Sequence, residues 1–155
     1  MIIRPSLPSG YLHICDDVRQ EFNGKFTFVG IYYGEMIFAG VNHGVVPQLS
    51  IVVTYQFAPG DLPNRMRTRA VFLGDSGRET LLIEDEAELP QSPPPTTFPI
   101  QPDEVPVLEW RRFLRIGTTM FPEPGRIRVR GYFGDAELRL GSLRVTIVPP
   151  APSPT

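Results

Sequence analysis

Apolar and polar residues alternate with a period of two along most of the chain. Between residues 49 and 57 the apolar side chains share one parity: Leu49, Ile51, Val53, Tyr55 and Phe57 alternate with Ser50, Thr54 and Gln56. This pattern predicts a β-strand with one buried face and one wetter face. No window of 11 or more residues that is free of Pro and Gly has the spacing of an amphipathic helix. Strands therefore dominate the expected fold.

Seven further segments have strand patterns: 11–16, 25–38, 67–74, 79–84, 112–118, 126–133 and 138–147. The segment 25–38 is apolar on both parities, which predicts a strand covered on both faces, with bends at Gly30 and Gly34. In the last strand segment the apolar residues stand at even positions before Gly141-Ser142 and at odd positions after it, which predicts a bulge or a bend there.

Turn residues separate these strands at two clear places. Gly74-Asp75-Ser76-Gly77 and Gly134-Asp135 each predict the turn of a β-hairpin. About eight short, mainly antiparallel strands with little helix predict an all-β fold, a single-domain β-sandwich. A β-barrel is the alternative architecture.

Proline interrupts the strand pattern in two segments. Residues 90–106 hold seven of the chain's 18 prolines, so this segment is neither a central strand nor a helix. It is expected to run extended, as a connection between the two sheets or as a docking segment for a partner. We therefore expect a sandwich domain over residues 1–148, including the proline-rich loop 90–106, and a proline-rich tail over 149–155.

Composition narrows the function further. The 155 residues, with 15 basic and 17 acidic side chains, give a net charge of −2, which argues against nucleic acid as a partner. Cys15 is the only cysteine, so neither a disulfide framework nor a cysteine metal site is expected, and no cofactor motif is present. No segment has the character of a secretory signal or a membrane span, so a cytoplasmic location without membrane contact is expected.

Two groups of residues are candidates for a reaction centre or a metal centre. His13 and Cys15 project to the same side of one predicted strand, but neighbours on a strand face point in parallel, so we expect a packed histidine and a buried thiol. The loop carboxylates Asp16, Asp17, Asp75 and Asp135 allow a calcium site as an alternative.

Arginines form two one-sided rows on predicted strands: Arg126, Arg128 and Arg130, and Arg65, Arg67 and Arg69. Like charges in neighbouring rows repel, so we expect the rows to pair with acidic residues such as Glu79 or Glu137, or to lie apart. The alternative is a face that binds an anion or an acidic partner.

Lys25 is the only lysine among the 15 basic residues and follows the turn dipeptide Asn23-Gly24. A compact ammonium at this place predicts an ion pair across the hairpin with Asp16, Asp17 or Glu21.

The N-terminal block carries a family resemblance. Its elements are Cys15-Asp16-Asp17-Val18-Arg19, Gly24-Lys25 and Gly30-Ile31-Tyr32. The chain resembles a family of short, uncharacterised bacterial proteins over about residues 11–33, and more loosely at Pro124 to Val129. The resemblance implies a compact all-β fold and transfers no catalytic residue.

These observations predict a non-enzymatic binding module, with a protein partner or a second copy of the chain as its target. The candidate contact residues are Asp16, Asp17, Lys25, Tyr32, Tyr33, Arg126, Arg128 and Arg130. Two alternatives stay open: a protein that binds a metal or small ligand through loop carboxylates, and a structural component of a phage-like or secretion assembly.

Overall fold

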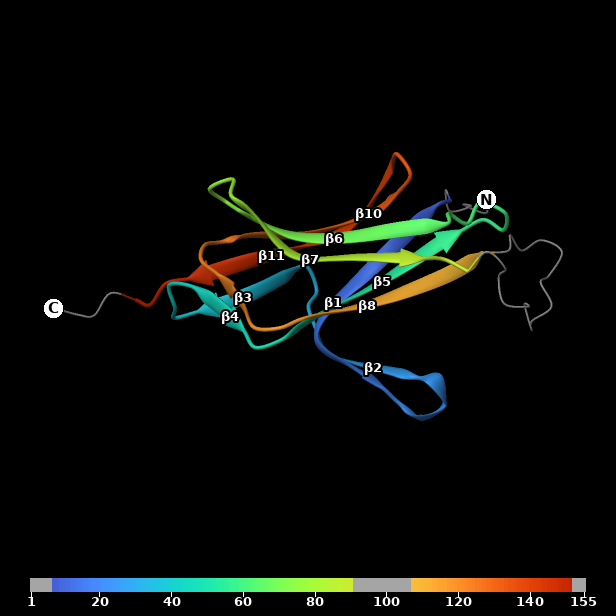
Figure 1. Ribbon diagram of the computed structural model, residues 1–155. Coiled ribbons are helices and arrows are strands. Elements are labelled where there is room, and N and C mark those ends of the chain that lie inside the picture. The colour runs from blue at the N-terminus through green and yellow to red at the C-terminus, as the bar shows by residue number, and fades with distance from the viewer. Residues whose placement is uncertain (1–6, 91–106, 152–155) are drawn as a thin grey trace, which may run out of the picture.

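The computed structural model describes residues 7–90 and 107–151, and their regular structure is almost entirely β-strand (Figure 1). This confirms the all-β prediction. The strands are β1 (Ser9–Gln20), β2 (Phe26–Ile31), β3 (Glu35–Ala39), β4 (Gly44–Val46), β5 (Leu49–Phe57), β6 (Arg65–Gly74), β7 (Glu79–Glu88), β8 (Leu108–Ile116), β9 (Thr119–Phe121), β10 (Gly125–Phe133) and β11 (Ala136–Val148). One short 3-10 turn, η1 (Phe22–Gly24), lies between β1 and β2.

Two sheets stack to form a sandwich. Sheet A has the strand order β2-β1-β5-β8, and sheet B has the order β3-β11-β10-β6-β7. Strands β4 and β9 form a separate two-stranded ribbon. All pairings are antiparallel except that of β3 with β11, as the sequence predicts for a mainly antiparallel fold.

The core lies between the two sheets and follows the predicted alternation. Ile51, Val53 and Tyr55 of β5 are fully buried and belong to one apolar cluster with Ile127 and Val129 of β10. Burial of such side chains is the main stabilising contribution, about 1.5–3 kcal/mol for each large one.

A hydroxyl pair crosses this core. The phenol of Tyr55 in sheet A and Oγ1 of Thr68 in sheet B are 2.6 Å apart, and both residues are buried. Gly131 on β10 makes room for the ring, because a Cβ there would lie 2.6 Å from Cε1 of Tyr55.

The prediction of one strand over 25–38 is wrong. Gly34 adopts φ +77, a conformation that favours glycine, and the chain turns there from β2 in sheet A to β3 in sheet B. The short strands β4 and β9, with three residues each, carry too little pattern to be predicted. The described residues therefore contain eleven strands rather than about eight.

The prediction of a wetter face on β5 is also wrong. Ser50, Val52 and Thr54 are 3%, 1% and 1% exposed. The strand lies between β1 and β8, and both of its faces are covered.

Both predicted hairpin turns are confirmed. Gly74 to Gly77 joins β6 to β7, and Gly134-Asp135 joins β10 to β11. The predicted irregularity at Gly141 is confirmed as well, because the pairing of β11 with β10 shifts register between Val129 and Arg130. Of the proline-rich segments, residues 91–106 and 152–155 lie outside the described residues.

Candidate functional site

Strand β1 changes its neighbour halfway along its length. Up to Cys15 it pairs with β5, and from Cys15 onward it pairs with β2. The resulting hairpin, residues 16–31, leaves the sandwich on the outer side of sheet A (Figure 1); we call it the arm. Its tip is a tight turn with Asn23 and Gly24 at φ +66 and +72, and Phe22 beside it is 90% exposed.

Aromatic side chains attach the arm to the outer face of sheet A. Phe26 of the arm stacks on Phe113 of β8, with ring centroids 4.5 Å apart and an interplanar angle of 29°. Phe28 stacks on His13 of β1 at 5.4 Å. Such pairs contribute about 0.5–1.5 kcal/mol each beyond the area that they bury. The arm is therefore a partial third layer, and it explains why Val52 on the outer face of β5 is buried.

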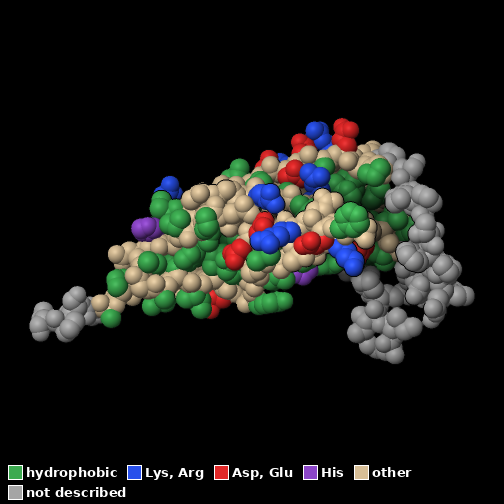
Figure 2. Space-filling view, turned by 90° about the horizontal axis from the view of Figure 1, so that it is seen from below, with side chains coloured by type: hydrophobic (Ala, Val, Ile, Leu, Met, Phe, Trp, Pro, Cys, Tyr) green, Lys and Arg blue, Asp and Glu red, His purple; other side chains and the backbone are tan. Residues whose placement is uncertain are grey.

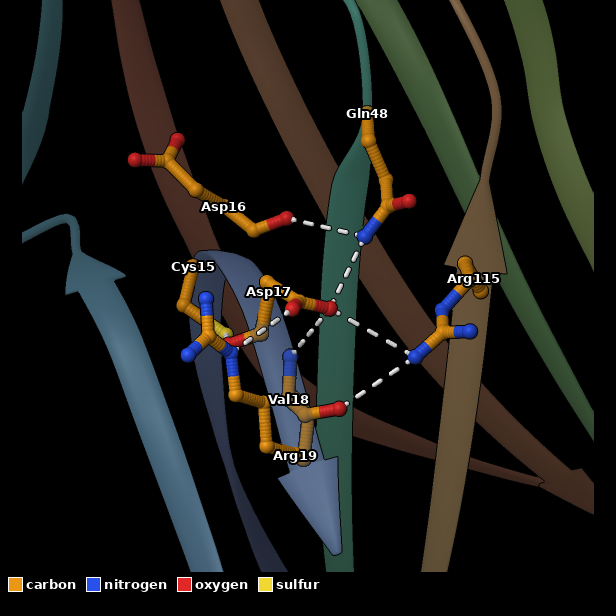
Figure 3. A network of polar contacts seen from close by, with 7 residues as sticks. All are labelled: Cys15, Asp16, Asp17, Val18, Arg19, Gln48 and Arg115. Carbon is orange, nitrogen blue, oxygen red and sulfur yellow. Dashed lines mark hydrogen bonds and ion pairs between the residues drawn. The ribbon is translucent and has the colours of Figure 1, made fainter.

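A network around Asp17 fixes the root of the arm (Figure 3). Oδ1 of Asp17 accepts hydrogen bonds from the Val18 amide at 2.9 Å, from Gln48 Nε2 at 2.9 Å and from Arg115 Nη2 at 3.5 Å. Oδ2 accepts from Arg19 Nε at 3.4 Å. Gln48 precedes β5 and Arg115 lies on β8, so this network, the Asp17 latch, joins the arm to two segments of the sandwich.

The latch stabilises the ionised form of Asp17. Desolvation alone would raise the pKa of this carboxyl, but the hydrogen bonds from Val18, Arg19 and Gln48 and the charge of Arg115 outweigh it. The pKa of Asp17 therefore lies below its ordinary value.

Between the arm and sheet A lies a cavity of about 400 Å³, the arm cleft. Its lining residues come from the arm, from β5 and from β8: Val18, Gln20, Phe26, Ser50, Val52, Phe113, Leu114 and Arg115. The hydroxyl of Ser50 is buried and has no hydrogen-bond partner in the described part of the chain. The cleft thus combines apolar walls with an unsatisfied polar group, which is the usual composition of a ligand site.

A second depression, the edge groove, lies on the other side of β1. In residues 7–90 and 107–151, the β1 segment from Ser9 to His13 pairs with β5 and has no hydrogen-bonded strand on its second side. The β11 segment 136–143 likewise pairs only with β10 there. The groove between them measures about 340 Å³ and is lined by Tyr11, Leu12, His13, Ile14, Ile31, Tyr32, Tyr33, Gly34, Leu140, Gly141, Ser142 and Leu143.

The two predicted tyrosines both line this groove but differ in their roles. Tyr32 donates its amide to the Ile14 carbonyl at 2.8 Å, and its hydroxyl donates to Asp16. Desolvation, followed by the hydrogen bond to Asp16, raises the pKa of Tyr32 to about 12. Tyr33, by contrast, is 83% exposed. Tyr32 therefore fixes the local backbone, whereas Tyr33 is available for contact.

The predicted ion pair of Lys25 is wrong. Among the described residues its ammonium lies within 4.0 Å of no carboxylate. The register explains the separation from Asp17, which is opposite Val29, four residues from Lys25, or about 13 Å at ~3.3 Å per residue. Glu21 lies beside Lys25 and donates its amide to the Lys25 carbonyl at 2.8 Å, but the two side chains form no ion pair. Arg19 and Arg115, rather than Lys25, neutralise Asp17.

The prediction that the arginine rows pair with acidic residues is confirmed in part. Strands β6 and β10 are neighbours, with Arg130 opposite Arg69. Arg69 pairs with Glu79 at 3.2 Å, and Arg130 pairs with Glu137 at 3.3 Å. Within the described residues, Arg126 and Arg128 of this face have no carboxylate within 4.0 Å.

The end of the molecule near the C-terminus has a different surface. Figure 2 shows hydrophobic side chains gathered over the end that carries β3 and β4, and charged side chains of both signs on other parts of the same face. The exposed apolar residues of these strands and their neighbours are Ile37, Val45, Met120 and Val148.

His13 and Cys15 do not form a reaction centre. Cys15 is fully buried, its thiol donates to the Asp17 carbonyl at 3.4 Å, and desolvation raises the pKa of the thiol to about 11. His13 packs against Phe28 instead. This is the packed histidine and buried thiol that the strand geometry predicts.

The structure does not bring the candidate calcium ligands together. Asp16 is bound by Tyr32, Asp17 belongs to the latch, and Asp75 forms a two-pronged ion pair with Arg144 at 2.8 and 2.7 Å. Among the described residues no group of three or more His, Cys, Asp or Glu side chains is placed to hold a metal ion. No helix in this part of the chain has the length and apolar character needed to cross a membrane.

Comparison with known proteins gives one family. No curated protein and no solved structure matches the chain. A family model matches residues 10–146, which include every strand from β2 to β10, and that family has no known function. The chain therefore belongs to the family of unknown function DUF6941.

Proposed function

We propose that this protein is a non-enzymatic binding module that holds an extended segment of a partner protein in the edge groove. The observation that carries the proposal is the unpaired edge of β1 from Ser9 to His13, with the exposed Tyr33 beside it. The buried thiol of Cys15 and the separation of the loop carboxylates support a role in binding rather than in catalysis.

An open strand edge is suited to such a partner because its free amide and carbonyl groups pair with any extended backbone. The groove adds side-chain contacts, since aromatic groups of Tyr11 and Tyr33 flank it and Leu140 forms part of its lining. Exposed tyrosines contribute strongly to binding at protein interfaces. A lone reduced cysteine accords with a bacterial cytoplasm, which we propose as the location.

Site-specific photo-crosslinking in the native cell tests this function. A photoreactive phenylalanine analogue replaces Tyr33 in one variant and Phe22 in a matched control, because both side chains are highly exposed aromatics. We expect a discrete cross-linked product at position 33 and not at position 22. A product of twice the chain mass would identify a second copy of the chain as the partner.

A second measurement asks whether the partner binds as a strand. In the cross-linked complex, the amide of Leu12 should exchange with solvent at least tenfold more slowly than in the free protein, because strand addition satisfies the edge of β1. Equal cross-linking at positions 22 and 33, or no protection at Leu12, would contradict the proposal.

A further inference from the structure

The arm cleft carries an inference that does not depend on the edge groove. We propose that the cleft binds a small amphiphilic monocarboxylate, which is a molecule with an apolar chain or ring and a single carboxylate. Three features of the cleft support this ligand: its volume, the unpaired hydroxyl of Ser50 and the positive charge of the guanidinium groups at its rim.

Volume and walls set the size of the ligand and the character of its body. The cleft of about 400 Å³ falls in the lower part of the ~300–1,000 Å³ range of small-molecule sites. Val18, Phe26, Val52 and Phe113 supply apolar walls on both the arm side and the sheet side. The Asp17 latch stands at the root of the arm, where Arg115 belongs both to the latch and to the lining (Figure 3). A compact apolar body fits such a space better than a long peptide does.

The unpaired hydroxyl in the wall of the cleft belongs to Ser50. This residue is 3% exposed and lines the cleft, and its Oγ has no partner among the described residues. Buried polar groups are normally hydrogen-bonded, so an unpaired hydroxyl on the wall of a cavity points to a polar group that enters with the ligand. The Ser50 side chain lies on the outer face of β5 and not on the face that packs in the core between the two sheets.

The charge at the rim selects a carboxylate as that polar group. Arg115 uses only Nη2 for its contacts with Asp17 and Val18, so its Nε and Nη1 are free of partners in the described part of the chain. Arg19 and Arg115 both pair with Asp17, so the latch itself, with two guanidinium groups and one carboxylate, carries one net positive charge. A guanidinium with two free donors binds a carboxylate in preference to an alcohol or an ammonium group.

The test uses octanoate as the probe, with octan-1-ol and acetate as controls that lack the charge and the apolar body respectively. Titration of the isotope-labelled full chain, followed by amide NMR, should show saturable shifts at Val18, Val52 and Phe113. Octan-1-ol should bind at least tenfold more weakly, because a hydrogen bond to a charged group is worth about 1.5–3 kcal/mol. Acetate should produce no saturable shift.

Two variants and a matched control connect binding to the residues named. Arg115→Gln should reduce octanoate affinity to that of octan-1-ol, whereas Arg111→Gln, on the same face of β8, should leave it unchanged. Ser50→Ala should weaken octanoate three- to tenfold without lowering the melting temperature, because it removes a hydroxyl that has no partner in the free protein.

The outcomes separate this proposal from the edge groove. No saturable shift at millimolar octanoate, equal binding of octan-1-ol, or an equal loss in Arg111→Gln and Arg115→Gln would each overturn it. Tyr33→Ala should leave octanoate binding unchanged, since Tyr33 does not line the arm cleft. Failure of one proposal therefore leaves the other intact.

Discussion

The hydroxyl pair between Tyr55 and Thr68 allows a quantitative test of the sandwich core. The two oxygens are 2.6 Å apart, and the two residues are 0% and 1% exposed. Tyr55→Phe leaves the Thr68 hydroxyl buried without its partner, and Thr68→Val does the same to the phenol. Each single change should lower the free energy of unfolding by about 1–3 kcal/mol, because a buried polar group then loses its only compensation. The double variant replaces both groups with apolar ones of similar shape and should lie within about 1 kcal/mol of the original protein.

Urea unfolding of all four proteins gives these free energies directly, and thermal melting provides a check of ~2–4 °C for each kcal/mol in a chain of this length. The decisive quantity is the coupling energy of the double-mutant cycle, which should be about 1 kcal/mol or more and favourable. If the two single effects simply add, the hydroxyls do not interact and the packing of sheet A on sheet B differs from that described. If neither single variant loses stability, at least one hydroxyl reaches water, and the core is less closed at this point.

Three further predictions concern the arm and the residues at its root. The pKa of Asp17 is lowered, so the latch is complete above the ordinary pKa of 3.8 and is lost only as the pH falls through the lower pKa of the folded state. The side-chain amide resonance of Gln48 should therefore titrate with a midpoint below pH 3.8. A midpoint near pH 5 would disprove the latch. Burial raises the pKa of Cys15 to about 11, so roughly one thiol in a thousand is ionised at pH 8. Iodoacetamide should therefore modify Cys15 only after the protein unfolds. Rapid labelling of the folded protein would show that the root of the arm opens. Gly30 adopts φ +65, and a Cβ there would clash with the Asp16 carboxylate, so Gly30→Ala should destabilise the protein by about 1–3 kcal/mol in urea unfolding. Gly24 adopts φ +72 and has open space around it, so Gly24→Ala should cost only about 1–2 kcal/mol.

Local patterns were sufficient to predict the architecture. Alternation along β5 and β10 fixes which side chains face the core, and the glycine-rich turns at 74–77 and 134–135 fix which strands are sequential neighbours. The pairing of Arg69 with Glu79 and of Arg130 with Glu137 was also accessible, because adjacent like charges on a sheet need nearby opposite charges.

The arm was not predicted because its signal is ambiguous. Apolar residues on both parities of 25–38 indicate a strand with two covered faces, but they do not say whether a sheet or a hairpin supplies the cover. The same ambiguity hid the burial of Ser50 and Thr54, whose polarity normally marks a wet face. Val52, which is apolar yet shares their parity, was the one available sign that the outer face of β5 is covered.

The two proposed binding surfaces are consequences of a single event in the chain. At Cys15, β1 passes from pairing with β5 to pairing with β2. Because β2 belongs to the arm and pairs with β1 only from Cys15 onward, the earlier part of β1 is left with an open edge, which borders the edge groove. Because the arm bends over sheet A, it encloses the outer faces of β5 and β8, which is the arm cleft. Asp17 lies two residues beyond the exchange, and its hydrogen bonds to Gln48 and Arg115 hold the arm in the position that creates both surfaces. The two carboxylates after Cys15 thus have different partners: Asp17 holds the root of the arm, and Asp16 accepts the hydroxyl of Tyr32.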